Sequence, residues 1–166
     1  MYINRARSAD ARSQRGDTMI EVLVTIIIIA VGVLGTAALQ VTTLKNLSTS
    51  HSTSIAAMLA DDLGERMRAN PDAANDYVHD IGNAPDAFPD CVANACTDAQ
   101  LALYDLGTWW QDATAVLPAL STEVRQEAGV YRIFVYWDED RSGSTGTACP
   151  PQGENDMECF TIDVTI

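Results

Sequence analysis

The stretch DTMIEVLVTIIIIAVGVLGTAALQ, residues 17–40, decides the fold that we expect for this chain. Residues 22–39 carry no charged side chain. As a helix rising 1.5 Å per residue they would extend roughly 27 Å, close to the thickness of the hydrocarbon core of a bilayer. The stretch is therefore predicted to be a helix that crosses a membrane.

The charges on either side of this helix predict its orientation. Residues 1–16 hold four arginines and one aspartate, a net charge of +3, so the formal charge of −13 leaves −16 for residues 17–166. Because basic residues stay on the cytoplasmic side, the amino end is expected in the cytoplasm and the rest outside. A surface so acidic repels phosphate backbones, and no direct binding of nucleic acid is expected.

The length and the cysteines bear on the part that follows the helix. A chain of 166 residues allows one globular head plus an appendage. Cys91 with Cys96 and Cys149 with Cys159 form two local groups. Four cysteines allow three pairings, of which closing the two local loops is the simplest, and disulfides imply an oxidising compartment outside the cytoplasm. A zinc site would need two close Cys-x-x-Cys pairs, and neither spacing fits.

Glu21 lies at the edge of the apolar run, four residues beyond Asp17. A carboxylate at full depth in a bilayer costs roughly 2.5–3.5 kcal/mol. A secretory signal cut near Ala37, or a permanent single-span anchor, would explain the charge order but not this carboxylate. Glu21 therefore suggests that a partner group neutralises it.

Gly16 followed by residues 17–40 resembles the class III leader of type IV prepilins and pseudopilins. The resemblance is carried by the basic leader, Gly16, Thr18, the pair Met19 and Ile20, Glu21 and the apolar helix. It implies that prepilin peptidase cuts between Gly16 and Asp17 and that the new amino terminus, on Asp17, is methylated. The family usually has phenylalanine at that first mature position.

The resemblance also implies a role for Glu21 in assembly, as the fifth residue of the mature chain. When such helices pack side by side in a filament, a carboxylate and a neighbouring α-amino group can neutralise each other in a low dielectric, where pairing matters far more than in water. Glu21 would thus set the register of an incoming subunit.

Apolar periodicity continues beyond the membrane segment and ends at Asn70-Pro71, because proline disfavours helix at the residue before it. The predicted helix, residues 18–69, would be roughly 78 Å long. We expect residues 1–16 to be the leader, residues 17–40 the transmembrane and polymerisation half of the helix, residues 41–70 its second half, and residues 71–166 the periplasmic head.

Residues 71–94 have loop composition, rich in proline, glycine, aspartate and asparagine. Thr97 with Gln100 then forms a capping-box pattern that opens a second helix, in which Trp109 and Trp110 are expected to be core residues. The sequences ADDLGERMRANP, residues 60–71, and CVANACTDAQLALYDLGTWW, residues 91–110, resemble the PilV subgroup of minor pilins.

The last third predicts two strands, residues 131–137 and residues 160–166, each with one apolar face to lie on the long helix. The expected fold class is α+β, the ladle fold of type IV pilins, in which a long amino-terminal helix packs on a small antiparallel sheet.

The connection between these strands opens with Asp138, Asp140 and Ser142 at alternate positions before Gly143, like the start of a calcium loop. The twelfth position, where an EF-hand needs a bidentate glutamate, is Cys149. Calcium is a weak alternative to a plain acidic turn. No catalytic set is found, so we expect neither an enzyme nor a cofactor.

The resemblance implies a minor pilin that is held in the inner membrane and then built into an extracellular type IV pilus, in a tip or priming complex that promotes pilus biogenesis. Its partners would be other minor pilins, the major pilin, prepilin peptidase, the inner-membrane assembly machinery and the membrane itself. The alternatives are a minor pseudopilin of type II secretion, and a secreted or anchored binding protein with a calcium loop.

Overall fold

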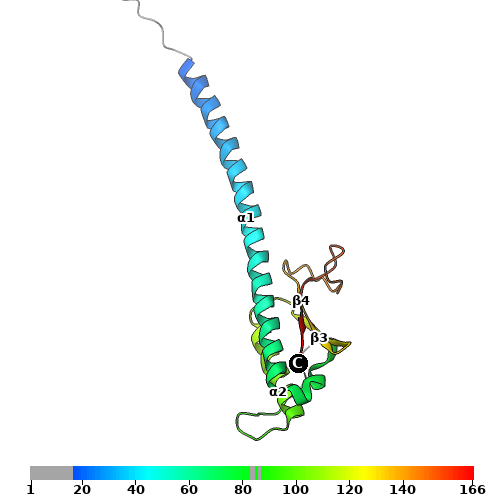
Figure 1. Cartoon of the computed structure of the whole chain (residues 1–166). Coiled ribbons are helices and arrows are strands. Elements are labelled where there is room, and N and C mark those ends of the chain that lie inside the picture. The colour runs from blue at the N-terminus through cyan, green and yellow to red at the C-terminus, as the bar shows by residue number, and fades with distance from the viewer. Residues whose placement is uncertain (1–16, 83–84, 86) are drawn as a thin grey trace, which may run out of the picture. The chain divides into compact units, whose positions relative to one another are not determined.

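The computed structural model describes residues 17–82, 85 and 87–166 (Figure 1). The chain divides into two compact units, Met1–Lys45 and Asn46–Ile166. The first helix, α1, spans Asp17–Ala69 and contributes to both units. The predicted helix is confirmed, beginning one residue earlier than expected and ending at Ala69, directly before Asn70-Pro71.

The serine- and threonine-rich part of α1, residues 48–54, is helical throughout. These residues form helices poorly because their hydroxyls compete for backbone groups. Here the hydroxyls bond back within the helix: Thr53 donates to the carbonyl oxygen of Thr49 at 2.8 Å, and Ser54 to that of Ser50 at 2.9 Å. The polar stretch therefore interrupts the apolar sequence without interrupting the helix.

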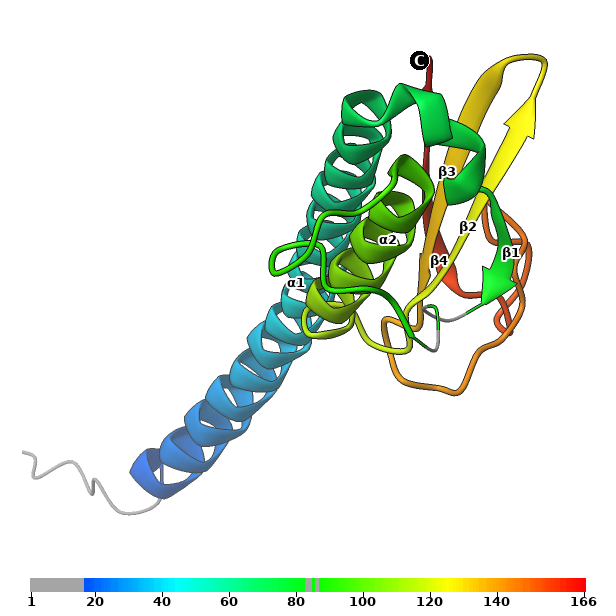
Figure 2. The ribbon, with the colours of Figure 1, turned by 90° about the horizontal axis from the view of Figure 1, so that it is seen from below.

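The second unit contains the end of α1, a second helix and an antiparallel sheet of four strands in the order β1-β2-β3-β4 (Figure 2). This arrangement confirms the predicted fold class, a long amino-terminal helix packed on a small antiparallel sheet. After α1 the elements are the 3-10 helix η1 (Pro71–Tyr77), β1 (His79–Gly82), α2 (Asp98–Thr114), β2 (Ser121–Glu127), β3 (Val130–Trp137) and β4 (Glu158–Val164).

The predicted capping box of α2 is present. Thr97 accepts from the backbone N–H of Gln100 at 3.3 Å, and the Gln100 side chain accepts from the backbone N–H of Thr97 at 3.0 Å. The Trp109 side chain is 1% exposed, and its indole N–H donates to the carbonyl oxygen of Leu59 at 2.9 Å. Trp109 therefore ties α2 to α1, whereas Trp110 is only half-buried.

One face of the end of α1 forms the core with α2 and the sheet. The buried residues of α1 are spaced by four, four and three positions, the pattern of a single helical face. From α1 they are Ala56, Ala60, Leu63 and Met67, and from β3 they are Tyr131, Ile133, Val135 and Trp137.

The expectation of one apolar face for β3 was incomplete. Phe134 and Tyr136, on the opposite face, are also buried and form a second small cluster with Met157. Met157 belongs to the long connection between β3 and β4, which the Cys149–Cys159 disulfide joins to β4. The sheet is thus covered on both faces at this point.

Two elements were missed. The assignment of residues 71–94 to a loop is wrong for η1 and β1, which lie inside that segment. β2 was not predicted because it contains a single aliphatic side chain, Val124, between polar residues. It is a strand because its backbone pairs with β3 over seven registered residue pairs.

The closest approach of the sheet to α1 is at Gly64. A methyl group placed there would lie 3.0 Å from Cγ2 of Val164 and 3.7 Å from Cδ1 of Ile162, both on β4. We predict that Gly64→Leu lowers the free energy of unfolding by about 1–3 kcal/mol, because the larger side chain overpacks this contact. Urea denaturation of the full chain measures the change.

Gly64→Ala is the matched control. Its methyl group needs Val164 to move by a few tenths of an ångström, while the gain in helix propensity of about 1 kcal/mol opposes that cost. Its stability should therefore stay close to wild type. Equal stabilities of the Leu and Ala variants would contradict the close packing of β4 on Gly64.

Candidate membrane and assembly segment

The first unit leaves its apolar side chains in contact with solvent. From Met19 to Leu47 every large apolar side chain of α1 is at least 49% exposed. So large an unbroken apolar surface is not stable in water, and it indicates contact with lipid or with other helices. In the described part of the chain, α1 is the one helix long and apolar enough to cross a membrane.

Glu21 lies on this exposed surface, near the amino end of α1. Its backbone carbonyl accepts the hydroxyl of Thr25 at 2.6 Å. Among the described residues, none forms a hydrogen bond or ion pair with its carboxylate. The partner that the sequence suggested for Glu21 must therefore come from outside the described residues.

The two proposed processing residues are placed only in part. Gly16 lies outside the described residues, and Asp17 is described only as the first residue of α1. The structure thus shows that helix is present immediately after the predicted cleavage position. Cleavage and methylation themselves stay predictions.

Gly32 and Gly35 have open space around them. A methyl group built on either would have no heavy atom within 4 Å outside its own local backbone. Nothing in the described chain therefore requires glycine at these two positions of α1. Small residues in apolar helices allow close approach of a neighbouring helix, which is the alternative to local helix softening.

Comparison with known families gives two matches that adjoin in the sequence. Residues 11–37 match the prokaryotic N-terminal methylation motif, and residues 38–107 match the family described as Type IV pilin Tt1218. These matches support the type IV pilin family for this chain. The searches of curated proteins and of solved structures found no match.

The pilin matches divide the chain according to its structure. The methylation motif covers the beginning of the exposed helix together with part of the segment before it, and the pilin match covers the rest of α1, η1, β1 and the first part of α2. The matched residues thus include Gly16, Asp17 and Glu21. The motif implies processing by prepilin peptidase and assembly into a pilus with other pilins, and the apolar helix is consistent with anchoring in the inner membrane before assembly.

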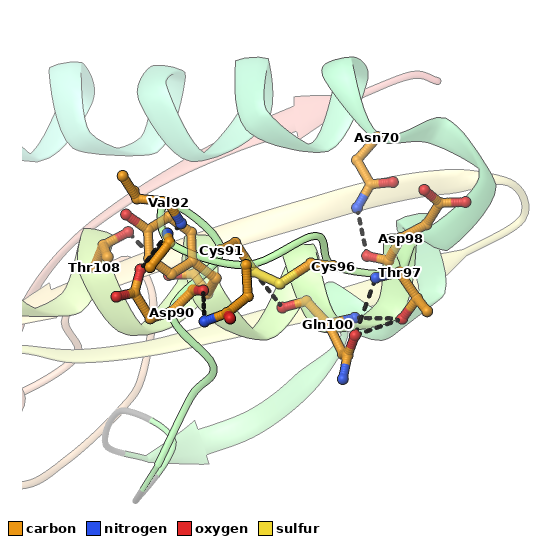
Figure 3. The surroundings of a disulfide bond; sticks show 12 residues. Asn70, Asp90, Cys91, Val92, Cys96, Thr97, Asp98, Gln100 and Thr108 are labelled. Atoms are coloured by element: carbon orange, nitrogen blue, oxygen red, sulfur yellow. Dashed lines mark hydrogen bonds between the residues drawn. A yellow bond between two sulfur atoms is a disulfide. The ribbon is translucent and has the colours of Figure 1, made fainter.

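The predicted disulfides are present in the head of this pilin, as Cys91–Cys96 and Cys149–Cys159. Figure 3 shows the first pair beside the capping box at the start of α2. The loop between these two cysteines is capped by Asp90, whose carboxylate accepts from the backbone N–H groups of Val92 and Ala93 at 3.0 and 3.1 Å. These bonds and the disulfide fix an otherwise exposed loop.

The candidate calcium ligands form a hydrogen-bonded turn. Asp138 is 4% exposed, and its carboxylate accepts from Ser142 at 3.2 Å and from the backbone N–H of Gly143 at 2.8 Å. Burial opposes ionisation of Asp138, but these hydrogen bonds outweigh it and lower the pKa. Asp140 also accepts from the Ser142 N–H, at 3.3 Å. Across the described residues, no cluster of three or more His, Cys, Asp or Glu side chains suits a metal ion, and calcium binding stays a prediction.

Glu139 makes a contact that sequence reasoning missed. Its carboxylate accepts from the Ser48 hydroxyl at 2.6 Å and from the Trp137 indole N–H at 2.9 Å. Burial opposes ionisation of Glu139, but the bonds from Ser48, Ser52 and Trp137 lower its pKa below the ordinary value. No sequence signal marks this contact, because Ser48 and Glu139 lie 91 positions apart. The contact joins the polar part of α1 to the end of β3.

We predict that Glu139→Gln destabilises the protein by roughly 1 kcal/mol at pH 6–7, because a neutral amide accepts these bonds less strongly. A lowered pKa in the folded state stabilises the protein above the unfolded value of about 4.3, and this contribution disappears as the pH falls through the folded value. The difference between the variant and wild type should therefore vanish near pH 3. Urea denaturation at several pH values measures it.

Glu154→Gln is the control, since no hydrogen bond or ion pair to its carboxylate is found among the described residues. It should match wild type at pH 6–7. A Glu139→Gln effect that persists unchanged at pH 3 would show that the ionised carboxylate is not responsible.

Proposed function

We propose that this protein is a PilV-type minor pilin, cut by prepilin peptidase between Gly16 and Asp17 and methylated on Asp17. The proposal is carried by one observation, that a methylation-motif match over residues 11–37 leads into an exposed apolar helix. Residues 1–16 are the leader in this account, residues 17–40 serve the membrane and polymerisation, residues 41–70 form the second half of the helix and residues 71–166 form the head.

Before assembly the protein spans the inner membrane once, with its amino end in the cytoplasm and its head in the periplasm. The charge of +3 before the apolar segment and −16 after it supports this orientation. The two disulfides support it as well, because such bonds persist in the periplasm and outside the cell.

Assembly transfers the apolar surface of α1 from lipid to the helices of neighbouring pilins. Glu21 is the specific element in this transfer, since its carboxylate finds no partner among the described residues. A neighbouring α-amino group neutralises it in the filament core, and the pairing fixes how far each subunit advances.

The protein acts together with other minor pilins, in a tip or priming complex that promotes pilus formation and also contacts the major pilin and the assembly machinery. The type II secretion pseudopilins share the amino-terminal segment. The match of residues 38–107 to a type IV pilin family favours the pilus over the secretion system.

The Glu21 proposal is tested by Glu21→Ala in cells that lack the native copy. Breaking a charge pair in a low-dielectric core costs several kcal/mol, so incorporation into sheared pili should fall by about tenfold or more. The variant should still be processed and should remain in the inner membrane at the wild-type level. Immunoblots of the pilus and membrane fractions measure both quantities.

Glu154→Ala in the head is the control and should be incorporated as wild type. Undiminished incorporation of Glu21→Ala would refute the assembly role. Loss of Glu21→Ala from both fractions would point to instability, and Glu21→Gln then decides: it preserves the shape of the side chain, and the proposal requires that it also fail to enter pili.

A further inference from the structure

A small pocket opens in the head between α2 and the β1 edge of the sheet (Figure 2). Its wall is mostly apolar, and the residues that matter here are Val78, Leu103, Leu106 and Trp110. Val78 and Leu103 are 41% and 40% exposed, so the apolar surface continues to the mouth. None of the roles considered above uses this pocket.

The size of the pocket suits one side chain. Its volume is about 240 Å³, below the roughly 300–1,000 Å³ typical of sites for drug-sized ligands. Its depth and apolar wall favour an elongated aliphatic or aromatic group. A side chain of a protein partner therefore fits better than a separate small molecule.

Most polar groups of the wall already have partners inside the head. The two ring nitrogens of His79 contact the carbonyl oxygen of Tyr77 at 2.9 Å and the Thr122 hydroxyl at 3.0 Å. The indole N–H of Trp109 donates to Leu59. The exception is Asp76 of η1, which lines the pocket and is exposed. In the described part of the chain, no hydrogen bond or ion pair reaches its carboxylate.

An apolar wall with one carboxylate selects a long aliphatic side chain with a cationic end. Lysine and arginine have this construction, since their methylene stems bury while the charged head remains near solvent. Tryptophan in the wall adds to the preference, because indole faces attract cations. Glutamate and aspartate are disfavoured by Asp76, and a purely aliphatic side chain leaves that carboxylate unused.

The charge of the head argues against a second copy as the occupant. Residues 46–166 hold five arginines and 20 acidic residues, a net charge of −15, so two heads repel each other. Four of the five arginines already pair with carboxylates of the same head, namely Arg66, Arg68, Arg125 and Arg132. The complementary surface belongs to a partner that is more basic than this chain.

We propose that this pocket receives a lysine or arginine side chain from a different, basic pilus subunit, with its stem against Leu103 and Trp110 and its charge beside Asp76. The identification of the partner as a pilus subunit rests on the proposed function. The preference of the pocket for a cationic side chain rests on the head alone.

The preference is tested on the mature chain, residues 17–166, in detergent micelles, with fluorine-labelled tryptophans observed by NMR. The probes are N-acetyl-lysine methylamide and N-acetyl-norleucine methylamide, which share the stem and differ in the charge. The lysine probe should shift the Trp110 signal in a saturable way and should bind about two- to fivefold more tightly than the norleucine probe, the range of a surface ion pair. Trp137 does not line the pocket and serves as the internal reference.

Asp76→Asn should abolish the advantage of lysine, and Asp72→Asn, which removes an exposed carboxylate of the same 3-10 helix, should preserve it. Equal binding of the two probes, or an absence of saturable shifts, would overturn the proposed preference. A lysine advantage that survives Asp76→Asn would show general attraction to the acidic head instead of recognition in the pocket.

The partner is tested in cells with Asp76→Lys against Asp72→Lys. The first variant should reduce pili per cell several-fold while its membrane level and amino terminus stay as in wild type, and the second should not. Wild-type pilus numbers with Asp76→Lys would overturn the pilus partner, whatever the probes show. Since probe binding does not need assembly, it can succeed even if the pilin proposal fails, and the two failures are distinguishable.

Discussion

The exposed apolar surface of α1 is the constraint on which the rest of the account depends. From Met19 to Leu47 the helix offers its large apolar side chains no contact within the chain, although burial of such groups dominates the free energy of folding. A surface of this kind is stable only in lipid or against other helices. Both environments also make an isolated carboxylate costly, which gives Glu21 its importance.

The head solves a different problem, that of fixing a small sheet on a helix with a limited core. Gly64 permits close approach of β4, Trp109 hydrogen-bonds to the backbone of α1, and Glu139 joins the polar part of α1 to the end of β3. Two disulfides fix loops that contribute little to the core. The head therefore combines a modest apolar core with specific polar and covalent links, as small extracytoplasmic domains commonly do.

The sequence predicted those elements whose signal is local. The helix 18–69 followed from composition and from Pro71, the start of α2 from Thr97 and Gln100, and β3 and β4 from alternation. β2 was missed because a strand with one aliphatic residue depends on its neighbour for pairing, and β1 because it is only four residues long within a segment of loop composition. The Glu139 contact and the Asp76 pocket join residues far apart in sequence, so no local pattern could reveal them. Gly16, Asp17 and Glu21 came from the resemblance to prepilins, and the environment of Glu21 is made by molecules outside this chain.

The most direct test of the central claim is the intact mass and amino-terminal sequence of the protein from native membranes, with and without active prepilin peptidase. The account predicts a chain that begins at methylated Asp17 when the peptidase is active and an uncut chain when it is not. A start near Ala38, or an uncut chain in both strains, would contradict it, because the apolar segment would then be a signal or a permanent anchor and not the assembling helix of a pilin.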